Sequence, residues 1–154
     1  MKPLSWRRMT AGERSLAVEM FGAGLDAGRV RILALPVWRR AFVAGPALIV
    51  WPAIAARPDF AAPEVPLRTQ AVFVHELTHV WQAQHGVALV LAKIKAGDSE
   101  RAYAYDLEQG RPFPAMNIEQ QAMVVEHAFL ASRGGETPHA AEVYAAAAAN
   151  WRRS

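Results

Sequence analysis

The chain has 154 residues, of which 53% are apolar and 20% are charged. This balance excludes an intrinsically disordered chain, and the length predicts a single compact domain over residues 1–154. Cysteine is absent, which excludes disulfides and thiolate metal ligands, so any metal must be held by histidine, carboxylate or backbone groups. The net charge of +3, with dispersed arginine pairs, is too weak a pattern to predict a nucleic-acid-binding surface.

Neither a membrane span nor a targeting segment is predicted. The longest uncharged run, residues 41–56, is interrupted by Gly45, Pro46 and Pro52, whereas a spanning helix needs about 20 apolar residues without such breaks. The basic residues near the N-terminus are not followed by an apolar segment, which argues against a secretory signal. We therefore expect a cytoplasmic protein, or one that is exported without a cleaved signal peptide.

The first part of the chain predicts one helix followed by strands. Thr10 and Glu13 have the spacing of a capping box, and apolar residues follow at helical spacing until Gly22. The alternation of charged and apolar residues over 29–33 predicts a half-buried strand. The apolar run 47–51, between prolines, predicts a second strand.

Helices are predicted for most of the remaining chain. One is expected over residues 66–85, beginning at a proline and ending before Gly86. An irregular stretch over 98–114 separates it from a helix over 117–134, and a last, alanine-rich helix is expected over 137–150. The predicted fold class is α+β, with a small N-terminal β-sheet and C-terminal helices.

The strongest chemical signal is the run His75-Glu76-Leu77-Thr78-His79. Two histidines four residues apart on a helix lie on one face, one turn apart, so both can reach one metal ion. The glutamate beside the first histidine is well placed to take a proton from a water molecule on that metal. His75 and His79 are therefore predicted zinc ligands, and Glu76 the predicted general base. Two partly buried structural histidines are the plain alternative.

A catalytic zinc needs a third protein ligand, and three candidates remain open. His85 falls where an extended zinc motif places a third histidine, but Gln82 stands where that motif has the glycine that turns the chain. Glu119 lies in the first turn of the helix that Asn117 caps, and Glu126 lies on the same helical face, seven residues later. Glu119 is the favoured ligand, with Glu126 orienting a histidine from behind it.

Several segments together resemble a known family: His75–Gln82 (HELTHVWQ), Tyr103-Ala104-Tyr105 and Asn117–Ala122 (NIEQQA), with residues 10–13 and 29–32 near the N-terminus. They are similar to the bacterial zincin-like proteins described as Vgr-related, whose genes lie near type VI and other contractile secretion systems. The likeness extends to about Leu130. It departs at Met123, where the relatives often carry a polar residue.

The resemblance implies a minimal zincin-like domain with the helical HExxH motif and a gluzincin-type site. In such a site His75, His79 and Glu119 would bind Zn2+, and Glu76 would act as the base. The resemblance implies this chemistry and a secretion-system context, but no substrate.

Peptide hydrolysis also needs a donor that stabilises charge on the substrate oxygen, and tyrosine often serves. Tyr103 and Tyr105 lie in the irregular stretch between the two ligand-bearing helices. Two residues apart in an extended chain, they point to opposite sides, so at most one faces the metal. Tyr105 is the predicted donor, although packing alone would explain both residues.

Two functions follow. The first is a zinc metallopeptidase that hydrolyses a peptide or amide bond and is associated with a type VI or related contractile secretion system. The alternative is a non-catalytic zinc-binding module that binds a secretion-system or phage-tail-like component. Glu76 favours the first, because a binding module needs no base beside its ligands. The expected partners are a peptide or protein substrate and secretion-system components, while the substrate and the oligomeric state stay open.

Overall fold

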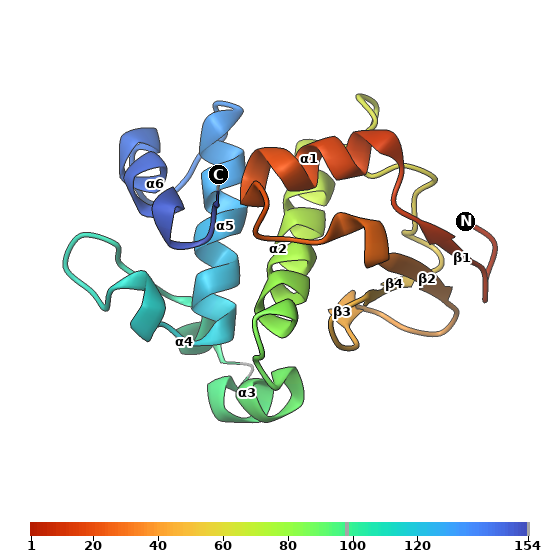
Figure 1. Ribbon diagram of the computed structural model, residues 1–154, viewed down its shortest axis with the longest axis horizontal. Helices are drawn as coiled ribbons and strands as arrows, with labels where there is room; N and C mark the ends of the chain where they lie inside the picture. Colours follow the sequence, from red (N-terminus) through yellow and green to blue (C-terminus); the bar gives the residue numbers. More distant parts are fainter. Residues whose placement is uncertain (98, 154) are drawn as a thin grey trace.

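The computed structural model describes residues 1–97 and 99–153, and it has an α+β fold, as predicted. A small sheet lies at one side of the molecule (Figure 1). Helices α2 (Leu67–Gln84) and α5 (Ile118–Ser132) run side by side through the middle of the molecule, and α6 (Ala141–Ala147) lies on the far side of α5. Asp98, at which the predicted irregular stretch begins, lies outside the described residues.

The sheet has four short strands in the order β1-β2-β4-β3. They are β1 (Trp6–Arg8), β2 (Arg31–Leu35), β3 (Phe42–Val43) and β4 (Leu48–Pro52). The central pair, β2 and β4, is parallel, and each outer strand is antiparallel to its neighbour. The alternation that predicted β2 corresponds to the buried Ile32 and Ala34 and their more exposed neighbours, which face opposite sides of the sheet.

The strand predictions need three corrections. The predicted strand 29–33 begins only at Arg31, because Ala27–Arg29 form a 3-10 turn. Strands β1 and β3 were not predicted: at two or three residues they are too short for a periodic pattern, and they exist because β2 and β4 offer them backbone partners. The predicted strand at 47–51 is confirmed as β4.

Helix α1 (Ala11–Phe21) begins at the predicted capping box, in which Thr10 and Glu13 bond each other's backbone N–H. The carboxylate of Glu13, fully buried, also accepts hydrogen bonds from the Phe60 backbone and from both terminal nitrogens of Arg7. This single side chain therefore ties the start of α1 to β1 and to the loop before α2.

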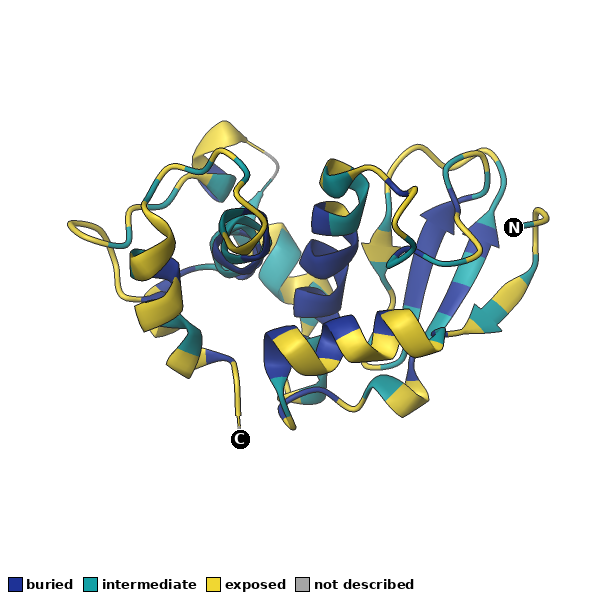
Figure 2. Cartoon of the chain, turned by 90° about the horizontal axis from the view of Figure 1, so that it is seen from above, coloured by how far each residue is buried: buried dark blue, intermediate teal, exposed yellow. Residues whose placement is uncertain are grey.

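The core lies between the sheet, α1, α2 and α5. Helix α2 packs against β3 and β4 on one side and α5 on the other, and most of its residues are buried (Figure 2). The apolar side chains of Phe73, Leu77 and Val80 on α2 meet Val125 and Phe129 of α5 in one cluster. Burying a side chain of this size contributes about 1.5–3 kcal/mol, so the packing of α2 against α5 holds the middle of the molecule rigidly.

The helices after α2 differ from the prediction. Residues Leu89–Ala96 form α3, which was not predicted, and α4 (Glu100–Tyr103) lies within the stretch expected to be irregular. Helix α3 has no buried residue, and the glycines that follow α2 and α3 have positive φ angles of 87° and 74°. The last helix starts at Ala141, later than expected, and continues as a 3-10 turn over Ala148–Asn150.

Candidate metal centre

Helices α2 and α5 bring together three of the predicted ligands. The Oε2 atom of Glu119 lies 3.3 Å from Nε2 of His75 and 3.4 Å from Nε2 of His79. One ligand atom from each residue lies within 4.8 Å of the others, so the group can hold a metal ion. The exposed fractions of His75, His79 and Glu119 are 9%, 8% and 2%, which places the group at the floor of a cavity rather than on the open surface.

The far nitrogen of each histidine is held by another side chain. Nδ1 of His75 lies 3.0 Å from Oε2 of Glu126, and Nδ1 of His79 lies 2.8 Å from Oε1 of Gln82. Since these oxygens accept hydrogen bonds, both rings carry their proton on Nδ1 when neutral, and both Nε2 atoms offer a lone pair toward Glu119. The amide nitrogen of Gln82 in turn donates to the Ile118 backbone and to Gln121, which links the two helices.

The second oxygen of Glu119 is bound by a lysine that the sequence did not indicate. The Nζ atom of Lys93, on α3, lies 2.5 Å from Oε1 of Glu119 and 3.0 Å from the Tyr103 hydroxyl. One carboxylate oxygen thus faces the histidines and the other faces a cation. Lys93 went unnoticed because α3 itself was not predicted, and nothing in the spacing connects residue 93 to residue 119.

The charges of the group depend strongly on one another. Burial acts to lower the pKa of His75, but hydrogen bonds to Glu119 and Glu126 outweigh it and raise the pKa to about 9. Burial acts to raise the pKa of Glu119, yet hydrogen bonds from His75 and His79 hold it well below its usual range. Without a metal, the raised pKa of His75 favours a protonated, positively charged ring between the carboxylates of Glu119 and Glu126.

Glu76 lies beside these ligands but does not share their contacts. Its side chain is buried, and Oε2 is without a hydrogen-bond partner within residues 1–97 and 99–153. Burial raises the pKa of its carboxyl, an effect that the nearby His79 and His75 partly offset. A buried carboxylate oxygen with no partner is costly, and it marks Glu76 as a group available to a molecule in the cavity.

The cavity above the group has a volume of about 800 Å3 and opens to solvent. His75, Glu76, His79 and Glu119 line its floor, the segment 38–43 lines one side, and Leu89, Val90, Lys93 and Ile94 of α3 line another. Volumes of this size are typical of sites that take a ligand or a short stretch of chain.

The chain and its fold are similar to a known protein and to a domain of it. The chain is 34% identical, over 134 residues, to the type VI secretion system spike protein VgrG2b of Pseudomonas aeruginosa, covering 80% of this chain and 13% of the spike protein. The solved effector domain of VgrG2b superposes with a TM-score of 0.70 at 31% identity, covering 96% of this chain and 84% of that domain. The chain belongs to the family of the VgrG2b effector domain.

Membership of this family links the chain to type VI secretion and confirms the Vgr-related part of the resemblance. The chain spans only about 13% of the length of the spike protein, so it corresponds to the effector domain. No protein-family model matches the chain. Among the described residues, no helix has the length and apolar character that crossing a membrane requires.

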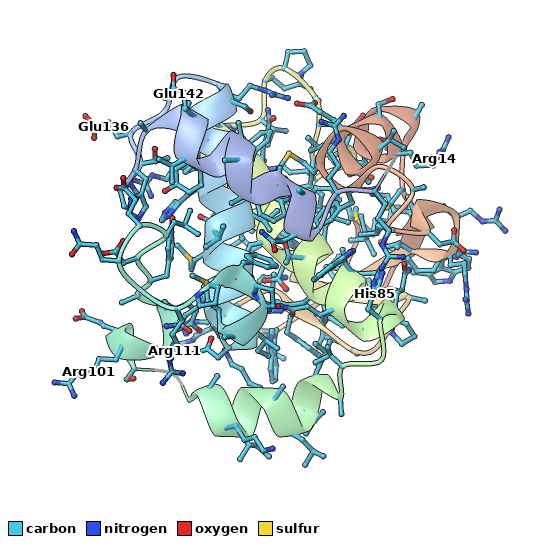
Figure 3. The ribbon with its side chains drawn as sticks, turned by 60° about the vertical axis from the view of Figure 1, so that its left-hand side comes forward. Arg14, His85, Arg101, Arg111, Glu136 and Glu142 are labelled. Carbon is cyan, nitrogen blue, oxygen red and sulfur yellow. The ribbon has the colours of Figure 1, made fainter. Side chains whose placement is uncertain are left out.

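The structure distinguishes among the remaining candidates for this effector-family site. His85 directly follows α2, is exposed (Figure 3), and donates from Nδ1 to the Trp81 backbone 2.8 Å away. It is not among the residues that line the cavity. Glu126 contacts His75 from behind, the place expected of an orienting residue. The helix does continue through Gln82, as the missing glycine of the extended motif indicated.

Tyr105 is not where its predicted role requires. Its hydroxyl lies 2.6 Å from Nδ1 of His127 and 2.7 Å from the Tyr144 hydroxyl, in a cluster that joins α5 to α6 outside the cavity. Burial and the bond to Tyr144 raise the pKa of its hydroxyl, so it stays protonated. Tyr103 lines the cavity instead. The one-turn helix α4 ends at Tyr103, and this turn decides which tyrosine faces the cavity.

Proposed function

We propose that this chain is a zinc-dependent hydrolase of peptide or amide bonds that acts as an effector domain in type VI secretion. One observation carries the proposal: two buried histidines and a carboxylate converge from α2 and α5, and beside them Oε2 of Glu76 has no hydrogen-bond partner among the described residues. Two imidazoles and one carboxylate are a ligand set of catalytic zinc sites, in which a further coordination position stays open to water or substrate. The likeness to a VgrG2b effector domain supports the secretion context.

The residues fit zinc in chemistry as well as in number. Nε2 of His75, Nε2 of His79 and Oε2 of Glu119 would hold the ion, because their other polar atoms already have partners in Glu126, Gln82 and Lys93. A bound zinc ion supplies Lewis acidity, which polarises a carbonyl and lowers the pKa of water.

The other side chains then have defined tasks. Glu76 accepts a proton as water adds to the carbonyl carbon, and it passes that proton to the departing amine as the C–N bond breaks. Its burial raises the pKa of the carboxyl, which makes Glu76 a stronger base. Tyr103, on the cavity wall, is the hydroxyl positioned to donate to the carbonyl oxygen as negative charge develops there.

The Glu76→Gln variant tests this proposal. It should bind zinc as the natural chain does but lose at least about 100-fold in hydrolysis of a degenerate, internally quenched peptide library, because an amide cannot accept the proton. The matched control is Glu136→Gln, which makes the same change at an exposed residue (Figure 3) that does not line the cavity. Equal hydrolysis by Glu76→Gln and the natural chain would contradict the proposal. Zinc binding without any hydrolysis would favour the non-catalytic, zinc-binding module.

A further inference from the structure

The cavity is bounded by two exposed apolar walls. On one side, Trp38 and Phe42 are 48% and 36% exposed, with ring centroids 5.3 Å apart. On the other, Val90 and Ile94 are 75% and 73% exposed and lie one turn apart on α3. Large apolar side chains that remain exposed on both sides of one cavity mark a surface that is completed by a partner.

The charges of the same cavity are separated. Its acidic side chains, Glu76, Glu119 and Glu126, gather at the candidate metal group. Arg39 and Arg40, beside Trp38, are exposed, and within the part of the chain that the structure describes neither guanidinium has a hydrogen bond or ion pair. The apolar wall around Trp38 therefore carries two solvent-exposed positive charges at the cavity.

We propose that this cavity binds a peptide that carries a bulky apolar side chain next to an acidic one. The apolar side chain would lie between Trp38 and Ile94, and the acidic side chain would meet Arg39 and Arg40. The inference rests on the proposed function for the position of the scissile bond, and it adds the class of substrate that the cavity selects.

An anionic membrane surface also combines acidic and apolar groups, but the geometry favours a peptide. The apolar and basic residues line a concavity with the histidines and Glu76 at its floor. A flat lipid surface could contact the rim but not the floor, whereas an extended chain of peptide length can do both.

Binding can be measured without hydrolysis. The zinc-loaded Glu76→Gln variant is titrated with three pools of short fluorescent peptides of equal length, in which the central pair is apolar–acidic, apolar–basic or alanine–acidic. The apolar–acidic pool should bind about tenfold tighter than either of the others, as expected when one buried aromatic contact and one charge pair each contribute.

Two variants of this protein separate the contributions. Adding Arg39→Glu and Arg40→Glu should reverse the preference from acidic to basic peptides, while Trp38→Ala should weaken both apolar pools about tenfold and leave the charge preference intact. The matched control is Arg101→Glu with Arg111→Glu, two exposed arginines outside the cavity, which should change nothing (Figure 3).

Three outcomes would overturn the inference. They are equal or undetectable binding of the three pools, a charge preference that survives reversal of Arg39 and Arg40, and displacement of the peptides by vesicles of phosphatidylcholine and phosphatidylglycerol. Failure of the proposed function would look different. A chain that binds the apolar–acidic pool selectively but hydrolyses no peptide would contradict the proposed hydrolase activity, whereas the proposed binding preference would stand.

Discussion

Nδ1 of His79 lies 2.8 Å from Oε1 of Gln82, one turn later in the same helix. The sequence motif identifies Gln82 only as a residue that is not glycine, whereas in the structure it orients a predicted metal ligand and joins α2 to α5. The Gln82→Ala variant should therefore bind zinc about 10–100-fold more weakly, since an unsupported imidazole loses its fixed orientation. Competition with a chromogenic chelator measures this, with Gln109→Ala, at an exposed position, as the control.

Replacing each of the three candidates for the third ligand should change zinc affinity by a different amount. Glu119→Ala should lower zinc affinity by more than about 100-fold, because it removes a ligand atom and leaves Lys93 without its carboxylate. Glu126→Ala should lower it by about 10–100-fold, because it only orients His75. His85→Ala should have no effect. The assignment fails if Glu119→Ala binds zinc as tightly as the natural chain does.

Zinc binding should depend on pH through His75. The metal-free protein holds a proton on this ring with a pKa of about 9, and a ligand must release that proton to bind a metal. Apparent zinc affinity should therefore fall about tenfold for each pH unit below 9, provided that other groups do not titrate. Chelator competition at several pH values tests this, and Glu126→Gln should make the dependence shallower because it removes one support of the raised pKa.

The same pKa shift predicts the stability of the metal-free protein. The pKa of His75 is about 9 in the folded chain and about 6.5 when unfolded. The stabilisation is therefore fully present below about pH 6.5 and is lost as the pH rises through 9. Thermal melts of chelator-treated protein should show Tm falling over this range. A Tm that stays flat there would contradict the ion pairs of His75 with its carboxylate neighbours.

The two tyrosines offer a direct comparison. Tyr103→Phe should lower kcat about 10–1,000-fold with little change in zinc affinity, because it removes a donor that acts on the substrate oxygen. Tyr105→Phe should leave kcat nearly unchanged and lower the free energy of unfolding by about 1 kcal/mol, since its hydroxyl bonds His127 and Tyr144 outside the cavity. The opposite pattern would return the catalytic role to Tyr105.

Replacing Glu13 should lower the stability of the fold and leave zinc affinity unchanged. Glu13→Ala removes the carboxylate that pairs with Arg7, and it takes away the side-chain acceptor of the backbone N–H groups of Thr10 and Phe60. The expected loss is about 3–5 kcal/mol in the free energy of unfolding, measured by urea denaturation. Zinc affinity of the folded fraction should be unchanged, because Glu13 does not contact α2 or α5 through its carboxylate.

How much of the site was predictable follows from how local its signals are. His75 and His79 share a face because four residues make about one helical turn, so the spacing alone indicated them as a candidate pair of ligands. Asn117 indicated where α5 begins, but spacing left Glu119 as one of three candidates for the third ligand. Lys93 and the choice between Tyr103 and Tyr105 could not be predicted, because they depend on how α3 and α4 turn back toward α5. Strands β1 and β3 depend in the same way on neighbours distant in sequence.

Helix α3 differs sharply from α2 in how far its residues are buried. It carries Lys93 and half of the apolar wall, yet it has no buried residue, and a glycine with positive φ follows it. Its amide hydrogens should therefore exchange with solvent far faster than those of α2, whose residues lie in the core. The apolar wall on α3 is therefore expected to fluctuate more than the helix that carries the histidines. This wall and the two histidines at the floor of the cavity thus lie on separate helices, and Lys93 connects them through Glu119.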